Sequence, residues 1–216
     1  MNISLAELFC PHHCISCGKI GGILCECCKK YILDERKLNC LKCGAELIHE
    51  KCVKCDALPC LQFYVGKRKG ALKSLINNYK YNSVRACGDA LAELLAECIN
   101  IESAVVVPLP TIGKHVRERG FDHTKLLARK LVRLKGWKCE CVIERANNTV
   151  QVGASNEKRK VQAKEAYIVR QKLDSLKTYI LLDDVWTTGS SMMAAYEKIF
   201  QAGARKIVIA VIAKSG

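Results

Sequence analysis

The 216-residue sequence has few aromatic residues, few prolines and no long apolar run. Phe, Trp and Tyr together make up 6% of the chain, and there are four prolines. No stretch approaches the roughly 20 apolar residues of a membrane-spanning helix. Residues 1–10 lack the basic and apolar regions of a signal peptide. We therefore expect a folded cytoplasmic protein, a compartment in which thiols stay reduced.

Cysteine, by contrast, is abundant. The chain has 15 cysteines, and 11 of them lie in residues 1–60. Eight of these form four Cys-x-x-Cys pairs: Cys14 and Cys17, Cys25 and Cys28, Cys40 and Cys43, Cys52 and Cys55. Each pair can present two thiolates to one metal ion, and two pairs complete a tetrahedral zinc site. The repeated pattern predicts a double zinc ribbon with two structural Zn²⁺ ions.

The spacing leaves the grouping of the pairs open. Sequential grouping joins the first pair to the second and the third to the fourth. A cross-braced arrangement would instead join the first pair to the third. Cys27 is a further thiol that can replace Cys25 or Cys28 as a ligand. An odd number of cysteines excludes a complete set of intramolecular disulfides.

Charge divides the chain at the same place as the cysteines. The formal net charge is +14. Residues 1–60 have eight Lys or Arg and seven Asp or Glu, whereas residues 61–216 have 27 and 14. The sequence thus predicts a zinc-ribbon domain at 1–60 and a basic domain at 61–216, and the excess of positive charge favours an anionic partner.

Apolar strands alternate with amphipathic helices in residues 61–216, which is typical of an α/β fold with a parallel sheet flanked by helices. The predicted strands are 61–65, 104–107, 139–144, 179–182 and 206–213. The predicted helices are 68–77, 85–100, 122–134, 156–163 and 190–201. Asp122 is the expected N-cap of its helix.

One segment of this domain has a pattern with a chemical meaning. The predicted strand 179–182 leads into Asp183 and Asp184, and then into a loop with hydroxyl side chains before the next helix. The loop residues are Thr187, Thr188, Gly189, Ser190 and Ser191. Backbone N–H groups at a helix N-terminus bind phosphate, whereas carboxylates accept hydrogen bonds from hydroxyls. The pattern therefore indicates a sugar phosphate such as the ribose 5-phosphate group.

This segment resembles the motif of type I phosphoribosyltransferases that binds 5-phosphoribosyl 1-pyrophosphate (PRPP). The resemblance implies that Asp183, Asp184 and the loop 187–191 bind PRPP together with Mg²⁺. It also implies that a loop with Leu109 and Pro110 meets the pyrophosphate, and that Arg117 and Arg119 lie on or near a flexible catalytic loop. Asp183, Asp184, Arg117 and Arg119 would then be the catalytic residues.

Further motifs occur in the same order as in the ComF family, and the resemblance covers essentially the whole chain. They are Val107-Pro-Leu-Pro110, Arg117-x-Arg-Gly-Phe121, Thr149-x-Gln151, Arg159, Ala166-Tyr167 and the double zinc ribbon. The family's usual Arg-Gly-Phe-Asn reads Arg119-Gly-Phe-Asp122 here. The resemblance implies a bacterial cytoplasmic protein of natural competence, the process by which cells take up single-stranded DNA. It also implies that the protein acts with other competence proteins at the inner membrane.

A basic run adjoins the predicted zinc ribbons. Lys67, Arg68 and Lys69 lie in a segment that also has Tyr64, Tyr79 and Tyr81 and no acid. Cations with aromatic side chains can bind single-stranded DNA through phosphate contacts and base stacking. The alternative is an ordinary basic surface helix with tyrosines in the core. A second basic group, Lys130, Arg133 and Lys135, is interpreted as a solvated helix face.

Three functions agree with these patterns. The first is a ComF-type protein that binds PRPP and single-stranded DNA, with or without phosphoribosyl transfer. The second is a metabolic phosphoribosyltransferase similar to amidophosphoribosyltransferases, for which residue 2, an Asn, offers no cysteine nucleophile. The third is a regulator that senses PRPP without turnover. The acceptor of the phosphoribosyl group is not identified by any of these residues.

Overall fold

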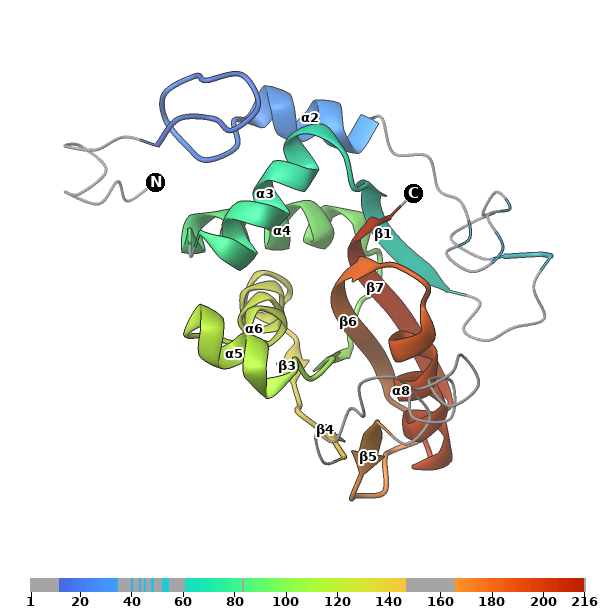
Figure 1. Ribbon diagram of the computed structural model, residues 1–216. Coiled ribbons are helices and arrows are strands. Elements are labelled where there is room, and N and C mark those ends of the chain that lie inside the picture. Colours follow the sequence, from blue (N-terminus) through green and yellow to red (C-terminus); the bar gives the residue numbers. More distant parts are fainter. Residues whose placement is uncertain are drawn as a thin grey trace.

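The structure is a computed structural model that describes residues 12–34, 40, 43, 45, 48, 52–54, 61–82, 84–146 and 166–215. A five-stranded sheet in the order β1-β7-β6-β2-β3 forms its centre, and all neighbouring strands in it are parallel (Figure 1). Its strands are β1 (Gln62–Lys67), β2 (Val105–Pro108), β3 (Lys138–Cys139), β6 (Thr178–Trp186) and β7 (Lys206–Lys214). A separate antiparallel pair consists of β4 (Ile143–Arg145) and β5 (Tyr167–Val169).

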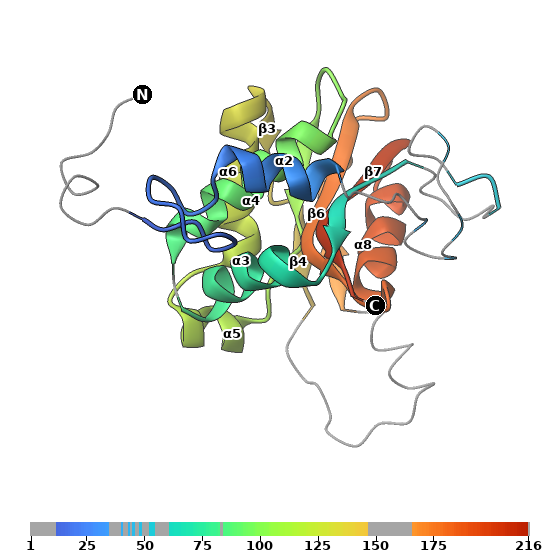
Figure 2. The ribbon, with the colours of Figure 1, turned by 90° about the horizontal axis from the view of Figure 1, so that it is seen from above.

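Helices cover both faces of the sheet (Figures 1 and 2). One face packs against α3 (Gly70–Tyr81), α4 (Arg85–Cys98) and α6 (His123–Lys135), and the other against α8 (Ser190–Gln201). Because successive side chains of a strand point to opposite faces, Ile180 and Leu182 join the first cluster and Tyr179 and Leu181 the second. This double coverage explains why the strands are apolar almost throughout, and it confirms the predicted parallel α/β sheet.

The start of α6 confirms the predicted N-cap. Asp122 has extended backbone, and its Oδ1 accepts a hydrogen bond from the backbone N–H of Lys125 at 3.1 Å. The same oxygen accepts from the Thr111 hydroxyl at 2.9 Å. An asparagine at this position could accept both bonds through its amide oxygen. Aspartate and asparagine are therefore both compatible with the local fold here.

The predicted strand 139–144 is wrong. The chain pairs with β2 only through β3, and Glu140 makes one further bond to the Val106 carbonyl. It then leaves the sheet, and β4 pairs with β5. Val142 and Ile143 are buried in the cluster on the α8 face, so their burial there stabilises the departure.

Two boundaries and one helix differ from the prediction in ways that affect the site. The first helix begins at Gly70 instead of Arg68, because the Arg68 N–H still bonds to the Lys214 carbonyl of β7. Strand β6 extends to Trp186, so the acidic pair lies within it. A short helix, α5 (Gly113–Arg119), was not predicted. The predicted helix 156–163 lies outside the described residues.

A cysteine-rich segment packs against the sheet domain through α2 (Glu26–Asp34). Ile32 and Leu33 of this helix pack against the core cluster that contains α4, and Lys29 forms ion pairs with Glu93 and Glu97 of α4. The division into domains at residue 60 stays a prediction. Within the described part of the chain, no helix is long and apolar enough to cross a membrane.

Candidate functional site: two cysteine clusters and a charged cavity

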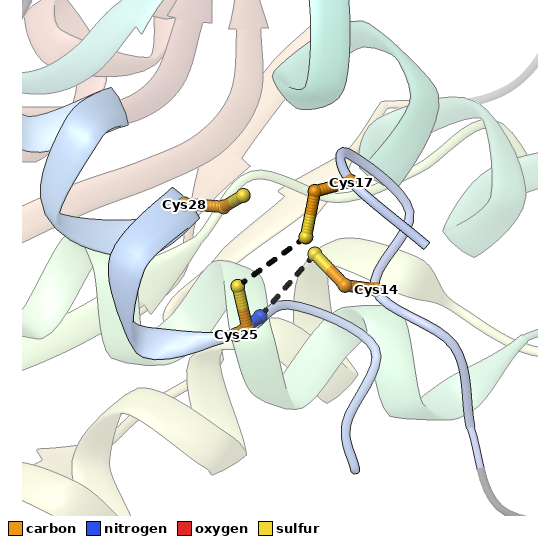
Figure 3. A group of neighbouring side chains, drawn as sticks. All are labelled: Cys14, Cys17, Cys25 and Cys28. Atoms are coloured by element: carbon orange, nitrogen blue, oxygen red, sulfur yellow. Dashed lines mark hydrogen bonds between the residues drawn. The ribbon is translucent and has the colours of Figure 1, made fainter. Parts of the chain in front are cut away.

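Four cysteines converge at the N-terminal end of α2. The Sγ atoms of Cys14, Cys17, Cys25 and Cys28 all lie within 4.8 Å of one another (Figure 3). Cys25 directly precedes α2 and Cys28 lies in its first turn, whereas Cys14 and Cys17 come from the turn before the helix. The grouping is therefore sequential for these two pairs. Cys27 is exposed and is not a member of this cluster.

The spacing and chemistry of this cluster fit a zinc ion. Cys17 and Cys25 have their sulfurs 3.7 Å apart, close to the ~3.8 Å edge of a tetrahedron with ~2.3 Å Zn–S bonds. Burial opposes ionisation of Cys14, but hydrogen bonds from the N–H groups of Cys25, Cys17 and Ser16 outweigh it and lower the pKa of Cys14 to about 6. A hydrogen bond with Ser16 favours ionised Cys28, yet Cys25 and Cys17 raise the pKa of Cys28 to about 12. Four thiolates at this distance repel one another, and a divalent cation removes that repulsion.

The third and fourth pairs show the same arrangement as far as it is described. Cys40, Cys43 and Cys52 lie within 4.8 Å of one another, with 3.5 Å between the sulfurs of Cys43 and Cys52. The predicted fourth ligand, Cys55, lies outside the described residues. Gln62 of β1 donates to the Cys40 sulfur at 3.6 Å, and Lys214 of β7 donates to the Cys40 carbonyl at 3.1 Å. These bonds tie the second cluster to the carboxyl edge of β7 and the start of β1. All cysteines in the described segments are thiols.

The acidic pair lies at the carboxyl end of the central strand β6. Asp184 is buried and Asp183 is partly buried. The Asp183 Oδ1 accepts a hydrogen bond from the Asp184 N–H at 2.8 Å. Burial raises the pKa of Asp183, and the charge of nearby Lys80 offsets part of this effect. The strand thus presents two carboxyl groups at the edge where open α/β sheets bind ligands.

The loop after β6 is shaped by a glycine and a tryptophan. Gly189, the N-cap of α8, has φ +77°, and a Cβ atom there would collide with the Trp186 ring. The hydroxyl groups of Thr188 and Ser190 lie 3.0 Å apart at the start of α8. Thr187, Thr188, Ser190 and Ser191 are all exposed. Trp186 therefore positions the loop by packing beneath it, and the hydroxyls remain accessible to a ligand.

Two residues of the acidic site were not predicted as part of it. Lys80, in the last turn of α3, forms an ion pair with the Asp184 Oδ2, and its side chain is 15% exposed. His123, at the start of α6, lies with its Nε2 3.6 Å from the same oxygen and is buried. Both come from helices far from β6 in the sequence. In the sequence Lys80 is one of several basic residues between Tyr64 and Tyr81, a pattern that occurs on many solvated helices.

The proton on His123 can be assigned from its neighbours. The Arg119 guanidinium lies 3.0 Å from Nδ1, and arginine can only donate. Nδ1 is therefore the acceptor, and Nε2–H faces Asp184 and the Thr124 hydroxyl. Burial, and then the charges of Lys80 and Arg119, lower the pKa of His123 to about 3. Neutral His123 thus accepts from Arg119 through Nδ1, and its Nε2–H faces the Thr124 hydroxyl at 3.3 Å and the Asp184 carboxylate at 3.6 Å.

These groups line one cavity of about 260 Å³. The charged and histidine side chains that face it are Lys80, His115, Arg119, His123, Arg145, Asp183 and Asp184. The predicted pyrophosphate loop also reaches it, because Leu109 and Pro110 are among the lining residues. The N–H of Leu109 bonds to the Leu182 carbonyl at 2.8 Å, which holds this loop beside β6.

The two arginines predicted for catalysis are placed differently. Both lie in the last turn of helix α5 rather than on a loop. Arg119 lines the cavity, bonds to His123 and packs over the Tyr81 ring at 5.3 Å. Arg117 is exposed and is absent from the described lining of the cavity. The alternation of a short helix brings one of the two side chains to the site and turns the other away.

A second cavity of about 460 Å³ adjoins the first. The two share Leu109, Pro110, Thr111 and Arg145. Lys125, Asp122, Cys141 and Glu144 also face the larger one. Glu144 accepts a hydrogen bond from Arg170 at 2.9 Å. Strand β4 thus forms one wall of a space next to the acidic site.

The basic surface is only partly as predicted. Lys67 and Lys69 are exposed, whereas Arg68 is half-buried and donates to Asn77 at 2.8 Å. Lys130 forms an ion pair with Asp89, and Lys135 donates to the Ile99 carbonyl at 3.0 Å. The interpretation of this second group as a solvated face thus holds fully only for Arg133, because Lys130 and Lys135 are partly buried and have partners in the fold.

The tyrosines near the basic run also divide into two kinds. Tyr64 and Tyr79 are buried, and the Tyr79 hydroxyl donates to the His123 carbonyl at 2.8 Å. Tyr81 is 63% exposed, and Arg119 packs over its ring. Two of the three rings are thus core residues, and a base could stack only on the third.

No protein-family model matches the chain, and no curated protein matches it significantly. Three solved structures are similar to parts of it. The allosteric regulatory enzyme of purine biosynthesis is 16% identical with a TM-score of 0.42, and glutamine PRPP amidotransferase from B. subtilis is 14% identical with a TM-score of 0.38. Both matches cover 57% of this chain and 25% of the other. Purine phosphoribosyltransferase from Pyrococcus horikoshii Ot3 is 20% identical, has a TM-score of 0.34, and is matched over 59% of this chain and 70% of its own.

Proposed function

We propose that the cavity at the carboxyl end of β6 binds PRPP. One observation supports this most strongly: a single strand–loop–helix unit places two carboxyl groups and the start of a helix on the same cavity, beside partly buried cations. The carboxylates suit the hydroxyls of a ribose, and the helix N-terminus with its hydroxyl loop suits a phosphate. Because all three TM-scores lie below 0.5, the proposal depends on this geometry and on the motif.

The parts of PRPP match different parts of the site. Loop 187–191 would bind the 5-phosphate, and Asp183 and Asp184 the ribose hydroxyls. The loop with Leu109 and Pro110, together with Arg119, would face the pyrophosphate, whose negative charge increases as it leaves. Arg117 would take part only if α5 rearranges, since its side chain is exposed.

Mg²⁺ would be held mainly by the oxygens of PRPP and by water, as is usual for this ion. Donor atoms of His123, Asp183 and Asp184 lie within 4.8 Å of one another. Lys80 already provides a positive charge at Asp184. The chain therefore offers two carboxylates that can orient the metal-bound ligand, and a lysine that competes with a directly bound ion.

The test is titration with Mg-PRPP. Asp183→Asn and Asp184→Asn should each weaken binding by about 10- to 150-fold, since a hydrogen bond to a charged acceptor contributes ~1.5–3 kcal/mol. Asp174→Asn is the control, because Asp174 is exposed and caps a turn at Leu176. Unchanged affinity in both site variants would remove the ribose assignment. Release of pyrophosphate with and without candidate acceptors then separates transfer from sensing without turnover.

We further propose that the protein acts with single-stranded DNA in natural competence, as a cytoplasmic ComF-type factor working with partners at the inner membrane. The support is the ComF-like order of motifs, the excess of basic residues in 61–216, and two exposed lysines, Lys67 and Lys69, at the carboxyl end of β1. The metabolic phosphoribosyltransferase stays the alternative. The larger cavity beside the PRPP site supports transfer to an acceptor in either case.

Single-stranded DNA should bind without strong sequence preference and weaken steeply with salt. Lys67→Gln with Lys69→Gln should reduce the slope of log K against log salt by about 1.4, because each phosphate contact on a single strand contributes ~0.7. Lys172→Gln with Lys177→Gln is the matched control. Both lysines are exposed, and they precede β6 at the amino ends of the parallel strands, opposite the carboxyl end of β1. Equal slopes for the two double variants would leave only net charge as the cause. No binding by the wild type at low salt would favour the metabolic enzyme.

A further inference from the structure

We propose that Lys80 is a pyrophosphate-binding residue, held in the cavity by Asp184 until the ligand arrives. The inference rests on the proposed PRPP site and assigns that site a cation from outside the recognised motifs. Lys80 belongs to α3, upstream of every motif that the phosphoribosyltransferase resemblance includes. Its ammonium group nevertheless forms an ion pair with Asp184 in the cavity that Asp183 also lines.

Burial is the first argument. The Lys80 side chain is 15% exposed, and its partner Asp184 is 6% exposed. Lysines are rarely this buried, and a buried ion pair contributes little net stability because both ions lose their hydration. The neighbouring lysine of the same helix, Lys73, is exposed. A position that costs free energy and gains little in stability is typical of a binding group.

Charge balance is the second argument. Asp183 and Asp184 bring two carboxyl groups to the cavity, and neutral His123 brings no positive charge. A phosphate-bearing ligand is repelled by two carboxylates unless cations offset them. Lys80 and Arg119 are the cations within this network: Lys80 pairs with Asp184, and Arg119 bonds to His123. Arg145 also lines the cavity, and it packs over the Tyr167 ring at 5.4 Å.

An exchange of partners is the third argument. The ribose hydroxyls of PRPP would donate to Asp184, whose Oδ2 is the atom that Lys80 contacts. Lys80 then loses part of its attraction to that oxygen. Its flexible four-carbon stem lets the ammonium group turn toward Leu109, Pro110 and Thr111, which line the same cavity. Pyrophosphate oxygens bound at this loop offer a denser negative charge than the carboxylate that Lys80 leaves.

The experiment compares two ligands that differ only in the pyrophosphate. Mg-PRPP and ribose 5-phosphate are titrated into the full-length wild type, Lys80→Met and the control Lys73→Met. Lys80→Met should lower the affinity for Mg-PRPP by about 10- to 150-fold, the range of one charged hydrogen bond, and leave ribose 5-phosphate within about threefold. Lys73→Met should bind both ligands like the wild type.

A double variant separates a contact from a positioning effect. In the Asp184→Asn background the buried carboxylate is gone, so removing Lys80 leaves no unpaired ion to disturb the fold. If Lys80 binds pyrophosphate, Lys80→Met should still lower Mg-PRPP affinity in this background. A loss that disappears there, or that is equal for both ligands, would overturn the inference and leave the PRPP site intact. A wild type that binds neither ligand would overturn the proposed function itself.

Discussion

Removal of zinc should unfold the N-terminal cysteine-rich segment. We expect the purified protein to contain two zinc ions per chain, and Cys14→Ser or Cys25→Ser to lower this number to one. Structural zinc contributes on the order of 10 kcal/mol to the folding of such small modules. Ile15, Ile23 and Leu24 pack against the core of the sheet domain, so the loss should also expose that face. Metal analysis and limited proteolysis measure the two effects.

Cys27→Ser is the matched control for this experiment. Cys27 is exposed, sits beside Cys28 in the same helix and lies outside the cluster. Its replacement should keep both zinc ions and wild-type resistance to protease. A wild-type protein without zinc and with oxidised thiols would contradict the prediction. A Cys27→Ser variant that loses one ion would show that the ligand set differs from the one in Figure 3.

Gly189→Ala should abolish PRPP binding even though it removes no functional group. An L-residue at φ +77° is strained by ~1–2 kcal/mol, and the added Cβ would collide with the Trp186 ring, which is buried. Either the ring or the start of α8 has to move. A displacement of about 1 Å at a binding loop can reduce function by ~100-fold. We therefore expect a loss of at least about 100-fold in Mg-PRPP affinity, with a lower melting temperature.

The control for Gly189 is Gly136→Ala. Gly136 ends α6 with φ +68°, and a Cβ there would meet nothing within 4 Å. Its variant should show the backbone strain alone: a modest fall in melting temperature and unchanged Mg-PRPP affinity. Equal affinity losses in the two variants would mean that strain, and not the contact with Trp186, is responsible. Wild-type affinity in Gly189→Ala would contradict the role given to this loop.

Local patterns predicted the local features well. The Cys-x-x-Cys spacing predicted that the two thiols of each pair would lie close enough to bind one metal ion, because both belong to one tight turn. Apolar strands bounded by helices predicted the parallel sheet, and Asp122 was recognised as an N-cap from its position alone. The strand–acid–loop motif is contiguous, so its residues reach the same edge of the sheet in any fold that keeps β6 and α8.

Long-range features were harder to predict from the sequence. Val142 and Ile143 look like the continuation of a strand, but burial on the α8 face takes them out of the sheet. Lys130 and Lys135 look fully solvated in the sequence because their partners, Asp89 and the Ile99 carbonyl, belong to α4 and its C-cap. In each case the deciding contact joins residues about 30 or more positions apart, and periodicity within a segment contains no record of it.

The sequence by itself determined the parallel α/β sheet, the four Cys-x-x-Cys pairs, and the edge of the sheet at which Asp183 and Asp184 lie. The structure decided that the first cysteine pair groups with the second. Tertiary structure alone decided what surrounds those carboxyl groups. It placed Lys80 from α3 and His123 from α6 against Asp184, brought Arg119 to the cavity and left Arg117 exposed. The physical reason is that a contiguous motif positions its own residues, whereas counter-charges come from whichever helices pack against the strand.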